Sequence, residues 1–204
     1  MVFPIPGKGR HLQRYNDQGC RLVVGCIPYR FKSEGSEKTN NEVEVLLVSS
    51  PKSQEVMFPK GGWEFGESIK EAGRRETLEE AGVLGNVEDE LGIWRFKSKS
   101  QEIYHEGYMF PLLVTEELDP WPEKNVRKRA WMTVVEARDA CKQWWMKEAL
   151  DRLINRLPSP DELSPARPAD EQEIALATPV EQRFVPAIQA NIEEEQDVLL
   201  SSLS

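Results

Sequence analysis

The chain has 204 residues, of which 39% are hydrophobic, and this is enough for one folded domain with residues left over. Its formal net charge is −9 at pH 7. No apolar run approaches the roughly 20 residues that cross a bilayer, so we expect no membrane partner. Two histidines and three cysteines without a C-x-x-C pair argue against a zinc centre or a disulfide framework, and any metal should therefore have oxygen ligands.

The first 18 residues are predicted to form a basic arm. Lys8, Arg10 and Arg14 precede the first acidic residue, Asp17, and the segment lacks the apolar stretch of a secretory signal. Together with cysteines that suit a reducing compartment, this favours a cytoplasmic or nuclear protein. A mitochondrial targeting segment is the alternative interpretation of the same arm.

Short runs rich in Val and Leu predict the strands of the domain. "RLVVGCIPYR" (21–30) and "EVEVLLVSS" (42–50) are the first two, joined by a polar turn. "VMFP" (56–59) forms a third, short strand that leads into a glycine-rich turn, Lys60 to Gly62. Three further strands are expected at 91–100, 103–118 and 129–133.

A helix is predicted between Ser68 and Gly82. Ser68 and Glu71 have the S-x-x-E spacing of a capping box, and Gly82 is a suitable residue to end a helix. Inside this helix, Gly73 lowers helix stability by about 1 kcal/mol relative to alanine, but it allows a neighbouring element to pack closely.

A second helix is predicted from the T-x-x-E spacing of Thr133 and Glu136, and "KQWWMKEALDRLINRL" continues it at helical spacing. Trp144 and Trp145 are expected to lie in its core-facing stripe. The folded domain then spans 19–157.

Residues 158–204 differ from the domain in composition. They are rich in Pro, Ser, Asp and Glu, and they hold ten acidic residues against two arginines. This composition predicts a disordered acidic tail and leaves the remainder of the chain close to neutral.

Four carboxylates are concentrated around the first helix. Glu76, Glu79 and Glu80 are three or four residues apart, so they share one helical face, and Glu67 stands at its entrance. Carboxylates in one place need a compensating cation, and Mg²⁺ (or Mn²⁺) prefers such oxygen ligands together with substrate phosphates. Arg75 is expected to hold Glu67 by a bidentate contact.

The spacing of these residues is a motif. Gly61 is followed after five residues by Glu67, and after seven more by "RETLEEAGV" from Arg75 to Val83. This is the Nudix box, G-x5-E-x7-R-E-U-x-E-E-x-G-U, with Thr77 where an aliphatic residue is usual. From Gly19 to Leu157 the chain resembles the Nudix hydrolases. The resemblance implies an α/β protein with the Nudix fold, an α/β/α sandwich around a mixed β-sheet.

The resemblance also implies an activity and residue roles. Nudix hydrolases cleave a diphosphate linked to another group by water attack at phosphorus, with Mg²⁺ or Mn²⁺. Glu76 and Glu80 would be the principal metal ligands, and Glu79 the general base or a further ligand. Arg75 and Glu67 complete the catalytic set.

The substrate class follows from a narrower resemblance. "FPKGGWE", "WPE", "RKRAWMTVVEA" and "WWMKEAL" resemble plant members of the diphosphoinositol polyphosphate phosphohydrolase-like branch, which acts on inositol pyrophosphates and on long diadenosine polyphosphates such as diadenosine hexaphosphate. Ligands with many phosphates need cationic and neutral donors. The candidates for these contacts are Arg14, Arg21, Ser49, Ser50, Lys60, Gly61, Gly62, Lys97, Lys99, Arg127, Lys128 and Arg129.

Three alternatives stay open. The first is another Nudix substrate, such as ADP-ribose, NADH or a capped RNA end. The second is a non-catalytic binding module, against which the intact set of Glu76, Glu79 and Glu80 argues. The third is an RNA-binding protein that uses residues 127–129, although no RNA-binding motif is recognisable, so nucleic acid is not an expected partner. The expected partner is a polyphosphorylated small molecule, and a monomer is favoured.

Overall fold

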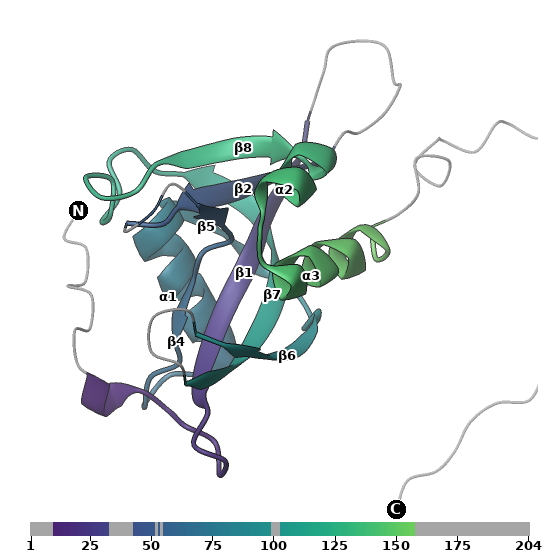
Figure 1. Cartoon of the computed structure of the whole chain (residues 1–204). Helices are drawn as coiled ribbons and strands as arrows, with labels where there is room; N and C mark the ends of the chain where they lie inside the picture. The colour runs from purple at the N-terminus through teal and green to yellow at the C-terminus, as the bar shows by residue number, and fades with distance from the viewer. Residues whose placement is uncertain (1–9, 33–42, 52, 54, 99–102, 158–204) are drawn as a thin grey trace, which may run out of the picture. The chain divides into compact units, whose positions relative to one another are not determined.

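The computed structural model describes residues 10–32, 43–51, 53, 55–98 and 103–157. Its elements in chain order are the 3-10 helix η1 (Arg10–Leu12), β1 (Arg21–Phe31), β2 (Val43–Ser49), β3 (Val56–Met57), β4 (Lys60–Gly62), α1 (Ile69–Ala81), β5 (Val83–Val87), β6 (Gly92–Lys97), β7 (Tyr104–Glu117), β8 (Arg129–Thr133), α2 (Val134–Ala140) and α3 (Trp144–Ile154) (Figure 1). None of these helices is long and apolar enough to cross a membrane. The predicted tail and residues 1–9 of the predicted arm lie outside the described residues.

The described strands form one mixed sheet. Its continuous order is β3-β2-β1-β7-β5, and β4 pairs with β1, β6 with β7 and β8 with β2. β1 and β7 are parallel, with Arg21 opposite His105, and the other pairs are antiparallel. β1 therefore lies at the centre and connects the short strand β4 to the rest of the sheet.

Different helices cover the two faces of this sheet (Figure 1). Side chains alternate along β1: Val24 and Cys26 pack with Ala72 of α1, whereas Ile27 and Tyr29 pack in the cluster that includes α2 and α3. Burial on both faces explains the nearly continuous apolar run of β1. The predicted α/β/α sandwich is confirmed.

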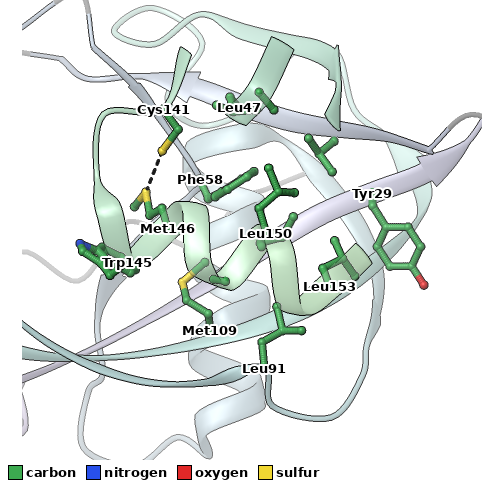
Figure 2. Packing of buried hydrophobic residues seen from close by; sticks show 14 of the residues in the cluster. Tyr29, Leu47, Phe58, Leu91, Met109, Cys141, Trp145, Met146, Leu150 and Leu153 are labelled. Carbon is green, nitrogen blue, oxygen red and sulfur yellow. Dashed lines mark hydrogen bonds between the residues drawn. The ribbon is translucent and has the colours of Figure 1, made fainter. Parts of the chain in front are cut away.

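The larger core lies between the sheet and α3, as Figure 2 shows. Leu150 and Leu153 are fully buried there, and the Trp145 ring stacks on Phe96 with centroids 4.4 Å apart. Trp144 is 58% exposed, so its predicted place in the core is wrong. Successive helical residues point about 100° apart, and only one of the two adjacent tryptophans faces the sheet.

The second predicted helix is two helices. Its start is confirmed, because Thr133 and Glu136 form a capping box. The backbone is extended at Cys141 and Gln143, which ends α2 and precedes α3. The Cys141 thiol is buried in the core, 3.7 Å from the sulfur of Met146. The break therefore lies where the chain buries a side chain between the two helices.

Two strands are missing from the sequence-based prediction. Lys60–Gly62, predicted as a turn, pairs with Val23–Gly25 of β1 as strand β4. β5 follows α1 directly, and its sequence "VLGNV" contains Gly and Asn, which disfavour a strand locally. Both strands form because a long neighbouring strand supplies backbone partners, which no local pattern reveals.

Candidate active site

Helix α1 begins and ends where the sequence predicts. The Ser68 hydroxyl accepts a hydrogen bond from the Glu71 backbone N–H at 3.3 Å, and the Glu71 carboxylate accepts one from the Ser68 N–H at 2.7 Å. Gly82 has left-handed backbone (φ 65°), and its N–H donates to the Leu78 carbonyl at 3.0 Å. These caps set the length of the helix that carries the predicted metal ligands.

The inner side of α1 packs closely on β1. A Cβ at Gly73 would lie 2.9 Å from the Cys26 sulfur, so glycine permits this approach, as the sequence suggests. Thr77, the departure from the Nudix pattern, is fully buried, and its hydroxyl donates to the Gly73 carbonyl at 2.8 Å. The substitution therefore leaves no unpaired buried hydroxyl.

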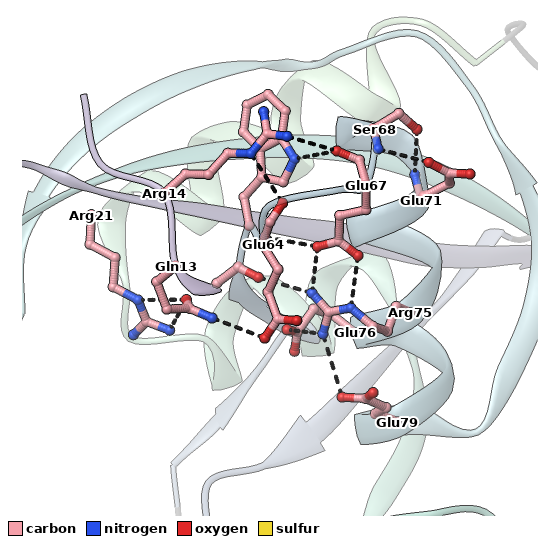
Figure 3. Close-up of polar contacts among 12 residues, drawn as sticks. Gln13, Arg14, Arg21, Glu64, Glu67, Ser68, Glu71, Arg75, Glu76 and Glu79 are labelled. Carbon is pink, nitrogen blue, oxygen red and sulfur yellow. Dashed lines mark hydrogen bonds and ion pairs between the residues drawn. The ribbon is translucent and has the colours of Figure 1, made fainter. Parts of the chain in front are cut away.

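The charged face of α1 is also buried. Glu76, Glu79 and Glu80 are only 9%, 7% and 6% exposed. A buried carboxylate is costly unless it is paired, so the partners of these three side chains define the site. Figure 3 shows the partners at the N-terminal end of the helix.

Arg75 contacts most of this cluster. Its Nε and Nη2 donate to the two carboxylate oxygens of Glu67 at 2.9 and 2.8 Å, which is the predicted bidentate contact. Its Nη1 donates to Glu76 at 2.7 Å and lies 3.6 Å from a Glu79 oxygen. Nη2 also donates to the Gly62 carbonyl at 3.0 Å. One guanidinium thus joins β4, the loop after it and α1.

Glu80 is held from the other direction. One carboxylate oxygen accepts the Lys60 backbone N–H at 3.0 Å, and the other forms an ion pair with Arg127. Arg127 also donates to the Glu123 carboxylate at 2.5 Å and to the Ser49 carbonyl at 3.0 Å. The segment before β8 is in this way connected to the carboxylate cluster.

The two glycines of β4 make room for different neighbours. A Cβ at Gly61 would overlap the Glu76 carboxylate, and a Cβ at Gly62 would overlap the Gln13 side chain. Neither glycine has positive φ, so space and not backbone conformation requires glycine here.

The helix carboxylates are in an environment that favours their neutral forms. Burial raises the pKa of Glu79 and of Glu80, each to about 7. The charge of Glu76 raises the pKa of Glu79 further, whereas Lys60 and Arg127 limit the rise in the pKa of Glu80. Burial also raises the pKa of Glu76. Glu79 and Glu80 therefore change protonation state near neutral pH, which suits a general base.

Glu67 behaves differently. Burial favours its neutral form, but hydrogen bonds from Arg75 and from the Glu64 backbone outweigh it and lower the Glu67 pKa. The pKa of Arg75 is raised by its carboxylate partners although burial opposes the rise. The Arg75–Glu67 pair is thus ionised at neutral pH and serves as a fixed support for the cluster.

The donor set fits a divalent cation. Among the described residues, no three His, Cys, Asp or Glu side chains already converge on one ion position. Arg75 and Arg127 form ion pairs with Glu76 and Glu80. Glu76, Glu79 and Glu80 are buried, and burial raises the pKa of each although Arg75, Lys60 and Arg127 lie beside them. Buried carboxylates whose charged forms are still incompletely compensated are suitable oxygen ligands for Mg²⁺ or Mn²⁺.

Two predicted substrate contacts, Arg14 of the arm and Arg21 at the start of β1, lie beside the site but engage protein groups. Arg14 donates to the Glu64 and Glu67 carbonyls at 3.0 and 3.3 Å. Arg21 donates twice to the Gln13 side-chain oxygen, at 3.0 and 2.6 Å. A phosphate would have to compete with these neutral acceptors.

Arg129 also has protein partners. Its Nη1 donates to the Ala81 and Gly82 carbonyls at 2.8 and 3.2 Å, and its guanidinium lies 4.1 Å from the Trp121 ring centroid. It forms an ion pair with Glu117 at 2.8 Å. These contacts stabilise the C-terminal end of α1 and differ from the predicted phosphate contact.

The other predicted contacts are spread around β4 and the end of β2. Lys60 is half-buried, and its amine lies 3.4 Å from the Met57 sulfur. Burial and the charges of Arg127 and Arg21 lower the pKa of Lys60, although Glu80 and Glu76 oppose the change. The Ser49 hydroxyl accepts the Lys128 backbone N–H at 2.9 Å. The remaining members are Ser50, which follows β2, Lys97, which is exposed at the end of β6, and Lys99, which lies outside the described residues.

Three residues of the site were not predicted. Glu64 and Glu123 both raise the pKa of Glu79, and Gln13 contacts Glu64 and Arg21. Glu64 follows the glycine pair closely, which is a usable local signal. Gln13 and Glu123 are far away in sequence, and only the folded chain brings them here.

Comparisons with known proteins agree with this geometry. The NUDIX domain model matches residues 21–153. The chain is 61% identical over 160 residues to Nudix hydrolase 17, mitochondrial, of Arabidopsis thaliana, covering 78% of this chain and 87% of that protein. It is 56% identical over 173 residues to Nudix hydrolase 18, mitochondrial, of the same plant, covering 85% and 96%.

Two more distant similarities extend the comparison. A human diphosphoinositol polyphosphate phosphohydrolase is 35% identical over 133 residues, covering 64% of this chain and 67% of that protein. The solved structure of a NUDIX hydrolase from Nitrosomonas europaea aligns with a TM-score of 0.54 at 20% identity, covering 67% of this chain and 89% of that one. The latter supports the fold.

The names of both Arabidopsis relatives place them in mitochondria, so the cytoplasmic location expected from the sequence is wrong. The basic arm is a feature that mitochondrial targeting segments share, and it is therefore consistent with these names. Nudix hydrolases act on phosphorylated small molecules and use divalent metal ions, typically Mg²⁺. On the motif in α1, the fold and the matched domain, the chain belongs to the Nudix family and is a Nudix hydrolase.

Proposed function

We propose that the protein hydrolyses phosphoanhydride bonds in highly phosphorylated small molecules, either diphosphoinositol polyphosphates or long diadenosine polyphosphates such as diadenosine hexaphosphate, with Mg²⁺ or Mn²⁺. The human relative is named for the first of these substrate classes. The metal would be held by Glu76 and Glu80, with Glu79 as base or further ligand.

One observation carries the substrate class. Arg21, Lys60 and Arg127 form a group of cations: burial lowers the pKa of Lys60, the charges of Arg127 and Arg21 add to the fall, and Glu80 and Glu76 oppose it only in part. An anion bound beside such a lysine would stabilise its charged form. These cations adjoin the carboxylate face of α1 through the contacts of Lys60 and Arg127 with Glu80. A substrate with several phosphates could contact both the metal site and this cation group.

The protein groups support a water attack on phosphorus as follows. Glu79 has a pKa of about 7, so at neutral pH a substantial fraction of its carboxylate can accept the proton of the attacking water. Arg75, anchored on Glu67, keeps Glu76 and Glu79 in place. The cation group holds the phosphates and offsets their charge. When bound, the divalent ion neutralises phosphate charge and makes a water more acidic.

We also propose a mitochondrial location for this protein. The support is the two Arabidopsis names and the arm in which Lys8, Arg10 and Arg14 precede the first acid. Expression of the full chain with a C-terminal fluorescent tag, scored against mitochondrial and cytosolic markers, tests it. A cytosolic signal alone would contradict it.

The substrate proposal is tested by measuring product release from diphosphoinositol pentakisphosphate, diadenosine hexaphosphate, ADP-ribose and NADH at matched low concentration, with Mg²⁺ and with Mn²⁺. Glu79→Gln is the blank. We expect the first two substrates to have the higher kcat/KM. Preference for ADP-ribose or NADH would keep the helix chemistry and overturn the substrate class.

A further inference from the structure

We propose that residues 12–15 act as a strap that positions the catalytic loop between β4 and α1, with Arg14 and Gln13 as its positioning residues. The strap lies before residues 21–153, the part of the chain that the Nudix domain model matches. The proposal rests on the proposed roles of Glu67, Glu76 and Glu79, because the strap acts through the loop that holds them.

The backbone of the strap joins the loop to the sheet. The Arg14 N–H donates to the Trp63 carbonyl at 2.9 Å, and the Phe65 N–H donates to the Leu12 carbonyl at 2.8 Å. On its other edge, the Leu22 N–H donates to the Arg14 carbonyl at 3.0 Å. The strap therefore has β-type pairing with the loop on one side and with β1 on the other.

The Arg14 side chain also contacts the loop, in addition to the backbone hydrogen bonds of the strap. Its guanidinium lies 4.4 Å from the Trp63 ring centroid, and it donates to the carbonyls of Glu64 and Glu67. The Trp63 indole N–H donates to the same Glu67 carbonyl at 3.1 Å. The backbone that presents the Glu67 carboxylate to Arg75 is thus held by two donors (Figure 3).

Gln13 provides a polar link at the other end of the strap. Its side-chain oxygen accepts from Arg21, and its Nε2 donates to the Glu64 carboxylate at 3.1 Å. Arginine only donates and carboxylate only accepts, so the two partners orient the amide. Gly62 leaves the space in which this amide lies, because a Cβ there would overlap it. Position 62 therefore requires glycine because of Gln13, a residue outside the matched domain.

The contacts distinguish positioning from phosphate binding at Arg14. A lysine would retain the positive charge that a phosphate needs, but it lacks the planar group that stacks on Trp63 and donates to two carbonyls at once. If Arg14 positions the loop, Arg14→Lys should therefore behave like Arg14→Ala. If it binds phosphate, lysine should restore most of the function.

The test compares Arg14→Lys, Arg14→Ala and Gln13→Ala with the matched control Arg152→Lys. Arg152 is an exposed arginine of α3 that likewise lies over a tryptophan ring, 4.8 Å from the Trp94 centroid, and donates to a backbone carbonyl, that of Leu91, at 3.1 Å. Hydrogen–deuterium exchange is followed in peptides covering 60–68, and Mn²⁺ binding to the metal-free protein is titrated by electron paramagnetic resonance. We expect exchange of this loop to be about 10-fold faster and Mn²⁺ binding to be weaker in all three strap variants, and unchanged in the control.

Turnover gives an independent readout. Misplacement of catalytic groups lowers kcat, so both Arg14 variants should lose about 10-fold to 100-fold in kcat with little change in KM. Wild-type exchange and kcat in Arg14→Lys, or a raised KM with unchanged exchange, would overturn the proposal. If the wild-type chain hydrolyses none of the tested substrates, the proposed function fails, while exchange and Mn²⁺ binding still decide on the strap.

Two truncations of the full chain test the strap as a unit. Removing residues 1–9 leaves the strap intact and should leave loop exchange and Mn²⁺ binding unchanged. Removing residues 1–15 should increase exchange in 60–68 and weaken Mn²⁺ binding, with thermal unfolding as the control for the rest of the fold. Equal behaviour of the two truncations would refute the strap.

Discussion

Gly61 lies directly against the carboxylate of Glu76, so closely that a Cβ at position 61 would overlap that carboxylate. Gly61 belongs to β4 and Glu76 to the middle of α1, and the contact brings the strand backbone to the predicted metal ligands. The motif glycine therefore serves a steric purpose, since its backbone does not have positive φ.

Gly61→Ala should displace the Glu76 carboxylate and lower kcat by about 100-fold, because small displacements of catalytic groups are costly. Thermal unfolding should change much less, since the helix caps and the α3 core are distant from the substitution. Steady-state kinetics with a melting curve would check this. Unaltered kcat would mean that the carboxylate can relax without consequence.

Glu79→Gln should lower kcat by about 100-fold or more and leave the protein folded, because the change is nearly isosteric and removes only the proton acceptor. Glu79 lies 3.6 Å from Arg75 but is also repelled by Glu76, so its charge adds little net stability. Single-turnover rates and circular dichroism provide the measurement. An unchanged rate would remove Glu79 from the proposed base role.

Arg75→Lys should impair catalysis although it conserves charge, because lysine cannot donate simultaneously to Glu67, Glu76 and the Gly62 carbonyl. We expect kcat/KM to fall by about 10-fold to 100-fold. Arg74→Lys, on the exposed neighbouring position, is the matched control and should keep wild-type kinetics. Equal effects of both substitutions would contradict the specific role of Arg75.

The metal-free protein should lose stability as pH rises from about 5 to about 8. Glu79 and Glu80 have folded-state pKa values near 7, above their ordinary value of 4.5. Within that window the folded state binds more protons than the unfolded state, so the free energy of unfolding falls as pH rises. The expected fall is several kcal/mol for the two carboxylates together, measured by urea unfolding.

His105 has the opposite effect, because burial and the nearby cations lower its pKa, so the wild-type slope combines both signs. The difference between wild type and Glu79→Gln isolates the carboxylate contribution, and the variant should show a smaller fall in stability. Added Mg²⁺ should stabilise the protein more at pH 8 than at pH 6. A variant with the same pH slope as wild type would contradict this assignment.

Removing residues 160–204 should leave hydrolysis and thermal stability largely intact. The described fold ends with α3 and its following turn at Leu157, and the Nudix domain model ends at residue 153. The same kinetic panel and a melting curve test the proposed domain boundary. A large loss of either would show that the acidic tail belongs to the functional unit.

Local patterns in the chain were sufficient to predict α1 and the face that its glutamates share. The capping box, the terminal glycine and the spacing of the glutamates depend on residues within one or two helical turns, so they predict the helix, its ends and the shared face without any tertiary contact. The bidentate Arg75–Glu67 pair is also within this range and is present.

Contacts between distant segments determined the rest. β4 became a strand because β1 supplies its partners, and α3 buried Trp145 but not Trp144 because only one faces the sheet. The arginines predicted to contact phosphate also have protein acceptors far away in sequence, such as the Glu67 carbonyl for Arg14. The sequence shows which residues carry positive charge, but it does not show which acceptor each one binds. The acceptor depends on strand pairing and helix packing, because a guanidinium binds the acceptors that the folded backbone places within about 3 Å of it.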